Sequence, residues 1–172
     1  MPFTVTDALT IAAIIIGPIV SVQISQALDR QRGDKERKLK LFKTLMSTRS
    51  VNLAPAHIEA LNMIDVEFDT KKAQEKPVVE AWKVYLDHLN DKNYPKEAWG
   101  ARRVDLQIDL LQKMAISLGY DFDKSHIRNT SYYPHGYGEL EDDQYVLRKG
   151  TIELLQGNRP ISVRVIENKE EN

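Results

Sequence analysis

The chain has 172 residues, of which 28% are charged, and contains no cysteine. This length allows one membrane segment plus one compact domain, and the lack of cysteine excludes disulfides and thiolate-bound metals. The net charge of -1 conceals an asymmetry. Residues 1–49 hold an excess of Lys and Arg, whereas the remainder holds an excess of Asp and Glu.

Residues 8–28 form an uncharged, apolar run between Asp7 and Asp29. As a helix this run is roughly 31 Å long, which is the thickness of a bilayer's hydrocarbon core. Basic residues follow the run instead of preceding it, which favours a retained anchor over a cleaved signal peptide. We therefore predict a single-pass transmembrane helix, with residues 1–7 outside and the C-terminal domain in the cytoplasm. A buried or surface-lying helix is the alternative.

Small residues recur at every fourth position of this run. They form one stripe along a helix, which consists of Ala13, Gly17, Ser21 and Ser25. Small residues let helices approach closely, so the stripe predicts self-association into a homo-oligomer, with chance spacing as the alternative. Pro18 is expected to kink the helix.

A basic stretch follows over residues 29–52 and is predicted to continue the helix beside the membrane. Its cations are expected to meet the anionic headgroups of the lipid bilayer; they are Arg30, Arg32, Lys35, Arg37, Lys38, Lys40 and Lys43. Nucleic-acid binding is not expected, because the stretch lacks interleaved aromatic residues and includes Asp34 and Glu36.

The rest of the chain is predicted to be a helical cytoplasmic domain over residues 53–160, so the fold class is mainly α. Apolar residues at helical spacing predict about four further helices, near residues 56–68, 78–89, 106–118 and 139–156. Gly119 and Gly157 are expected to cap the last two. Residues 161–172 are expected to form a strand or a flexible tail.

A tyrosine-rich segment precedes the last predicted helix. Two interpretations compete for its residues, which are Tyr132, Tyr133, His135, Tyr137 and Glu139. Tyrosines give large, rigid contact areas with a polar tip, which is typical of a recognition loop. The alternative is a loop packed over the helices, with its acidic residues favouring the dipole at the N-terminus of the last helix.

No motif for a cofactor or a catalytic reaction occurs in the sequence, so no cofactor is expected. The segment beginning at Asp121 starts like a calcium loop, but His126 replaces the glycine that such a loop requires, which favours a turn capped by aspartate. A metal site between helices is an alternative reading of several acidic residues and His88, namely Glu67, Asp69, Asp87, Asp105 and Asp109.

Several segments together resemble an uncharacterised family of small bacterial and phage-borne proteins that carry a domain of unknown function. The segments are "DALTIAAIIIGPIVSVQIS", "FKTLMSTR", "HIEALNMIDVEF", "AWKVYLDHLN", "DLLQKMAISLGYDFDK" and "YYPHGYGELE". The resemblance implies a single-pass anchor in the bacterial inner membrane with a helical cytoplasmic domain. It implies no activity, cofactor or catalytic residue.

These observations favour a non-enzymatic, membrane-anchored module. It would self-associate through its transmembrane helix and receive an unknown cytoplasmic protein partner, with phage-related defence or exclusion as a role that the resemblance suggests. One alternative is a small oligomeric membrane pore lined by polar residues, namely Thr10, Ser21, Gln23 and Ser25. A further alternative is a membrane-tethered hydrolase that uses His88, His126, His135 and nearby carboxylates.

Overall fold

The computed structural model describes the backbone of residues 5–162 and the side chains from residue 14 onwards, except those of residues 15 and 135. Its helices are α1 (Val5–Ser47), α2 (Pro55–Asn62), α3 (Ile64–Glu67), α4 (Lys76–Asn90), α5 (Lys96–Leu118), α6 (Lys124–Asn129) and α7 (His135–Leu155). No strand occurs within the described part, so the mainly α prediction is confirmed there. The predicted tail over 161–172 lies outside it, apart from Ile161 and Ser162, which belong to no helix.

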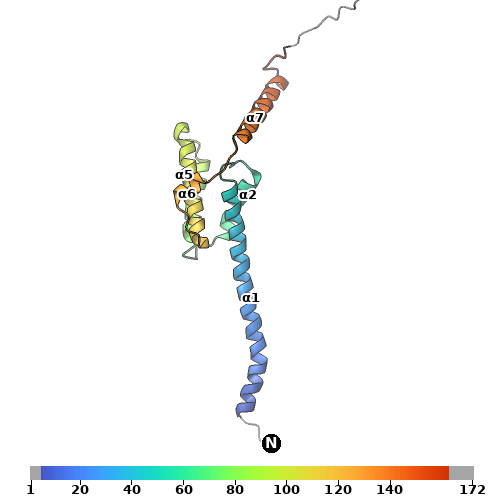
Figure 1. Cartoon of the computed structure of the whole chain (residues 1–172), viewed down its shortest axis with the longest axis vertical. Helices are drawn as coiled ribbons and strands as arrows, with labels where there is room; N and C mark the ends of the chain where they lie inside the picture. The colour runs from blue at the N-terminus through green and yellow to red at the C-terminus, as the bar shows by residue number, and fades with distance from the viewer. Residues whose placement is uncertain (1–4, 163–172) are drawn as a thin grey trace, which may run out of the picture. The chain divides into compact units, whose positions relative to one another are not determined.

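The chain divides into two compact units, residues 1–131 and 132–172. The first unit contains α1 to α6 and the second contains α7. Within the first unit, α2, α3 and α5 pack against the C-terminal half of α1, and α4 and α6 pack on α5, while the N-terminal half of α1 (blue in Figure 1) extends away from them.

α1 is one continuous helix of 43 residues with Pro18 in its interior. Proline lacks an N–H group and usually kinks or ends a helix, but here the helix continues on both sides of it. The helix ends at Ser47, five residues before the predicted boundary at 52, because a turn closed by the Val51 N–H and the Thr48 carbonyl follows it.

The prediction of a membrane-spanning helix is corrected by the structure. Across residues 5–162, no helix that could be assessed combines the length and the apolar character needed to cross a membrane. Polar residues Gln23 and Gln26, followed by charges from Asp29 onwards, lower the mean hydropathy of α1 in the part with described side chains. The finding contradicts the single-pass anchor over residues 8–28 and the inner-membrane location.

The hydrophobic core lies in the first unit, where α1, α4 and α5 meet. α4 and α5 make the most extensive contact between helices, and α1 packs on α5, α2 and α3. Residues with almost no exposed surface come from four of these helices and from α6, for example Leu45, Ile64, Val78, Tyr85, Leu110, Met114 and Ile127. Leu41, Phe42 and Leu45 enter the core from α1 because their spacing places them on one face of the helix.

The helix predicted over residues 56–68 is interrupted at Met63. The Met63 N–H contacts the carbonyls of both Glu59 and Ala60, so the regular pattern of α2 ends there and α3 adds one further turn. Beyond this break Ile64 and Phe68 are buried, and the Trp82 indole N–H donates a hydrogen bond of 3.1 Å to Asp65.

The predicted cap at Gly119 is confirmed, and Asp123, which was expected in a capped turn, caps a short helix instead. Gly119 follows α5 with φ of 87°, a left-handed conformation that glycine adopts without strain. The Asp123 carboxylate accepts a 2.6 Å hydrogen bond from the His126 N–H and caps α6. α7 begins at His135, four residues before the predicted start, because Pro134 immediately precedes it in an extended conformation.

Candidate functional site

The N-terminal half of α1 exposes its apolar side chains. Seven of the large apolar side chains described between residues 14 and 28 have about half or more of their surface exposed. The exposed fraction is highest for Ile14, at 67%. They are Ile14, Ile16, Ile19, Val20, Val22, Ile24 and Leu28. We call residues 14–28 the apolar arm. Such a concentration of exposed apolar surface marks an interaction site.

The predicted small-residue stripe lies on this arm. Ser21 and Ser25 are exposed, and a Cβ atom added to Gly17 would have no neighbouring atom within 4 Å. The side chain of Ala13 lies outside the described part. The stripe therefore faces open space along the arm, and no neighbour within this chain requires glycine at position 17.

The predicted basic stretch is divided between exposed cations and cations that hold the fold together. Arg30, Arg32, Lys35, Lys40 and Lys43 are exposed. Arg37 is paired with Asp34 at 2.5 Å and with Glu67 at 3.0 Å, and the hydrogen bonds to Glu67 and Asp34 raise the pKa of Arg37.

Lys38 is buried, and its ammonium lies 2.6 Å from the Glu75 carboxylate. It also lies 5.7 Å from the centre of the Phe68 ring. Burial alone would raise the pKa of Glu75, but hydrogen bonds from Lys38 and from the Asp69 N–H outweigh it, so the pKa is lowered. Lys38 and Arg37 thus join α1 to the helical unit and are not free for a ligand.

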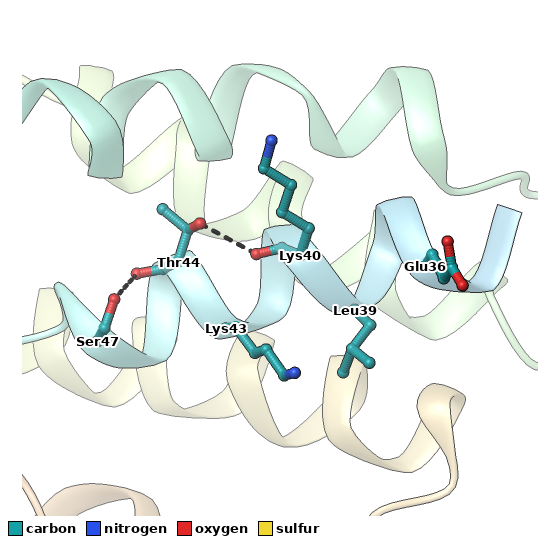
Figure 2. A pocket seen from close by; sticks show the side chains of 6 residues that line it. All are labelled: Glu36, Leu39, Lys40, Lys43, Thr44 and Ser47. Atoms are coloured by element: carbon teal, nitrogen blue, oxygen red, sulfur yellow. Dashed lines mark hydrogen bonds between the residues drawn. The ribbon is translucent and has the colours of Figure 1, made fainter. Parts of the chain in front are cut away.

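A shallow hollow of about 520 Å³ lies along α1 (Figure 2). Its lining comes from α1 alone, and comprises Glu36, Leu39, Lys40, Lys43, Thr44 and Ser47. The Thr44 hydroxyl donates to the Lys40 carbonyl at 3.0 Å, and the Ser47 hydroxyl donates to the Thr44 carbonyl at 2.9 Å. Because both hydroxyls bond to their own helix, the hollow offers a surface for contact and no preformed small-molecule site.

Only some residues of the tyrosine-rich segment contact one another. The Tyr133 hydroxyl donates a 2.7 Å hydrogen bond to Glu141, and its ring meets Tyr137 edge-on with centroids 5.7 Å apart. This hydrogen bond raises the pKa of Tyr133 to about 12. Tyr132 and Glu139 are exposed, and the side chain of His135 lies outside the described part.

Three of the five acidic residues suggested as metal ligands pair with basic residues in the structure. Glu67 pairs with Arg37, Asp105 pairs with Arg128, and Asp109 lies 2.6 Å from Lys124. His88 contacts the Trp99 carbonyl, and His126 stacks on Phe122. Within the part that could be searched, no three His, Asp or Glu residues form a group suited to a metal ion.

Sequence reasoning missed a buried polar cluster around His57, which is only 1% exposed. Its Nδ1 lies 2.7 Å from the Thr48 hydroxyl, which also donates to the Thr44 carbonyl, and its Nε2 lies 3.2 Å from the Gln107 amide nitrogen. A neutral ring that donates from Nδ1 and accepts at Nε2 satisfies this arrangement. Burial and the nearby Arg103 charge lower the pKa of His57 to about 4.

The His57 cluster joins the end of α1 to α2 and α5. Gln107 is also buried, and both ring nitrogens of His57 are occupied by protein groups. The arrangement fixes the packing of three segments and leaves neither ring nitrogen free for a substrate. Only the helical periodicity of His57 with Leu61 would have indicated that it faces inward.

No curated protein and no solved structure matches the chain. A protein-family profile, described as a family of unknown function, matches residues 3–172. This match covers nearly the full sequence, including the apolar arm, the helical unit around His57 and α7. The chain therefore belongs to the family of unknown function DUF6680.

Proposed function

We propose that this protein is a non-enzymatic interaction module that self-associates through the apolar arm and offers its helical unit to a second protein. The observation that carries the proposal is the exposure of seven large apolar side chains over residues 14–28. The partner of the helical unit and a role in phage-related defence or exclusion stay predictions.

The exposed surface contributes free energy on the scale that association requires. Full burial of one Ile, Leu or Val side chain is worth about 1.5–3 kcal/mol, so covering the exposed half of each contributes about 1 kcal/mol. Seven such side chains contribute roughly 7 kcal/mol per copy. Association costs about 4–15 kcal/mol in lost freedom, so several copies that each contribute this amount offset the cost.

The exposed side chains point to different sides of the helix, which sets a minimum number of chains for the assembly. Successive residues of a helix are rotated by about 100° around its axis, so Ile16 lies about 200° from Ile14, and Val22 lies about 80° from Ile14. One neighbouring helix covers only one side. We therefore expect each arm to contact more than one other arm, in a bundle of at least three chains. The stripe at Gly17 and Ser21 gives the side where two helix backbones approach most closely.

The test compares two exposed apolar residues of this chain. Ile24→Glu places a charge on the arm, whereas Leu53→Glu makes a comparable change at an exposed residue outside it. Sedimentation velocity of the full chain should show an assembly for the native protein and for Leu53→Glu, but smaller species for Ile24→Glu. Equal sizes for all three proteins would contradict the proposal.

A further inference from the structure

α7 carries a second exposed apolar face, separate from the apolar arm. Leu140, Leu147 and Leu154 lie seven residues apart, and each is exposed by more than a third, with Leu147 at 69%. Gln144 and Thr151 lie between these leucines on the same face of the helix. Away from this face lie the charged residues Glu139, Asp142, Lys149 and Glu153 together with the exposed apolar residues Tyr145, Val146 and Ile152, and Asp143 lies at the edge of the face.

A repeat of seven residues is the spacing at which two helices keep one seam in contact along their length. α7 has 21 residues, which gives three repeats over about 31 Å. If Leu140, Leu147 and Leu154 occupy the d positions, the a positions are Tyr137, Gln144 and Thr151. This assignment places Glu141 and Arg148 beside the seam at e positions.

The charges of α7 are distributed unevenly along it. Its N-terminal half carries the acidic residues Glu139, Glu141, Asp142 and Asp143, and its C-terminal half carries the basic residues Arg148 and Lys149 with Glu153 as its one acidic residue, which leaves that half with a net positive charge. In a parallel pair the acidic halves of two copies would lie side by side and repel. In an antiparallel pair each acidic half meets the basic half of the other copy.

We propose that α7 pairs with α7 of a second copy of this chain as an antiparallel two-helix coiled coil. In the matching register, Leu140 faces Thr151 of the second copy, Gln144 faces Leu147, and Tyr137 faces Leu154. Every layer of the seam then contains one leucine, whereas a parallel pair would stack Gln144 on Gln144 and Thr151 on Thr151. Glu141 lies beside Arg148 of the second copy twice, once on each side of the two-fold axis.

This pairing uses a surface that the apolar arm does not share, and it does not depend on the function proposed above. A short coiled coil of three repeats is weak by itself. If the arm also associates, the second contact forms at a high effective concentration. Crosslinking measures which residues of two α7 helices lie together, whereas sedimentation of the arm variants measures the size of the assembly. Failure of the α7 pairing and failure of the arm association can therefore be recognised separately.

The lack of cysteine in the chain makes disulfide trapping a clean test. The variants Leu140→Cys, Thr151→Cys and Leu154→Cys are made in the full chain, with distinguishable tags, and oxidised alone or in pairs. We expect the mixture of Leu140→Cys with Thr151→Cys to crosslink at least about tenfold more than any variant alone. Crosslinking of Leu140→Cys or Leu154→Cys alone would show parallel helices and overturn the proposal, as would no crosslinking in any mixture.

Charge reversal provides an independent readout. In the background of the Leu140→Cys and Thr151→Cys mixture, Arg148→Glu should reduce crosslinking several-fold, and adding Glu141→Arg should restore it. Lys149→Glu is the matched control, because Lys149 is the neighbouring cation on the other side of α7, and it should leave crosslinking unchanged. Equal losses for Arg148→Glu and Lys149→Glu, or no recovery in the double variant, would contradict the Glu141 and Arg148 pairing.

Discussion

His57 makes the stability of the helical unit depend on pH. The ring is buried and neutral in the folded protein, where its pKa is about 4, whereas an exposed histidine has a pKa near 6.5. As the pH falls from 6.5 towards 4, the unfolded chain binds a proton that the folded chain does not bind. The free energy of unfolding therefore decreases through this window and is fully retained above it.

The magnitude follows from the difference between the two pKa values. Each pH unit within the window lowers the free energy of unfolding by at most about 1.4 kcal/mol. Partial solvent screening reduces the sum, so His57 is expected to account for about 2–3 kcal/mol between pH 6.5 and pH 4. Burial, followed by the charge of Arg103, explains the sign because both disfavour the protonated ring, and a protonated ring would also present a second N–H group to the Gln107 amide nitrogen.

The assay is urea unfolding of the native chain and of His57→Gln at several pH values between 7.5 and 4. The glutamine amide is neutral over this range, and its oxygen and nitrogen offer one acceptor and one donor group. The difference between the two free energies cancels the titration of every other group that both proteins share. It should change by about 2–3 kcal/mol across the window in favour of His57→Gln at low pH. A difference that stays constant with pH would refute the reasoning.

Three further predictions concern other parts of the chain. Lys38→Met leaves the Glu75 carboxylate with Lys72 as its remaining cation, at 3.3 Å. This variant should lower the free energy of unfolding by about 2–4 kcal/mol. The double variant Lys38→Met with Glu75→Leu should recover most of that loss, as measured by thermal unfolding. Gly119→Ala should lower the free energy of unfolding by about 1 kcal/mol, because φ is 87° at this position. Gly100→Ala, inside α5, should not lower it. Equal effects of the two substitutions would contradict the role of Gly119 as a left-handed helix cap. Gly17→Ile should reduce the assembly size measured by light scattering, and Gly100→Ile, which also has open space, should not.

Local sequence signals predicted the helical elements and their caps well. Leu41, Phe42 and Leu45 have the spacing of one helix face, which the structure buries, and Gly119 caps α5 as expected, whereas Asp123 caps the helix α6 where only a capped turn was expected. These features depend on residues close together in the chain. The break at Met63 was not predictable, because it follows from the burial of Ile64 and Phe68 against helices far away in the sequence.

The long-range polar contacts were also beyond sequence reasoning. Gln107 lies 50 residues after His57, and Glu75 lies 37 residues after Lys38, so neither pair leaves a pattern in the sequence. For the same reason the basic stretch was read as uniformly exposed, although the structure buries Lys38. The apolar run was read as membrane-spanning from its lack of charge, which the helices described by the structure contradict.

The central claim is that copies of this chain assemble through residues 14–28. The most direct measurement is the mass of the full chain by sedimentation equilibrium over a range of concentrations, for the native protein and for Ile24→Glu. The account predicts at least three chains per particle for the native protein and a marked shift towards smaller species for Ile24→Glu. A native protein that stays monomeric over the whole range would contradict it.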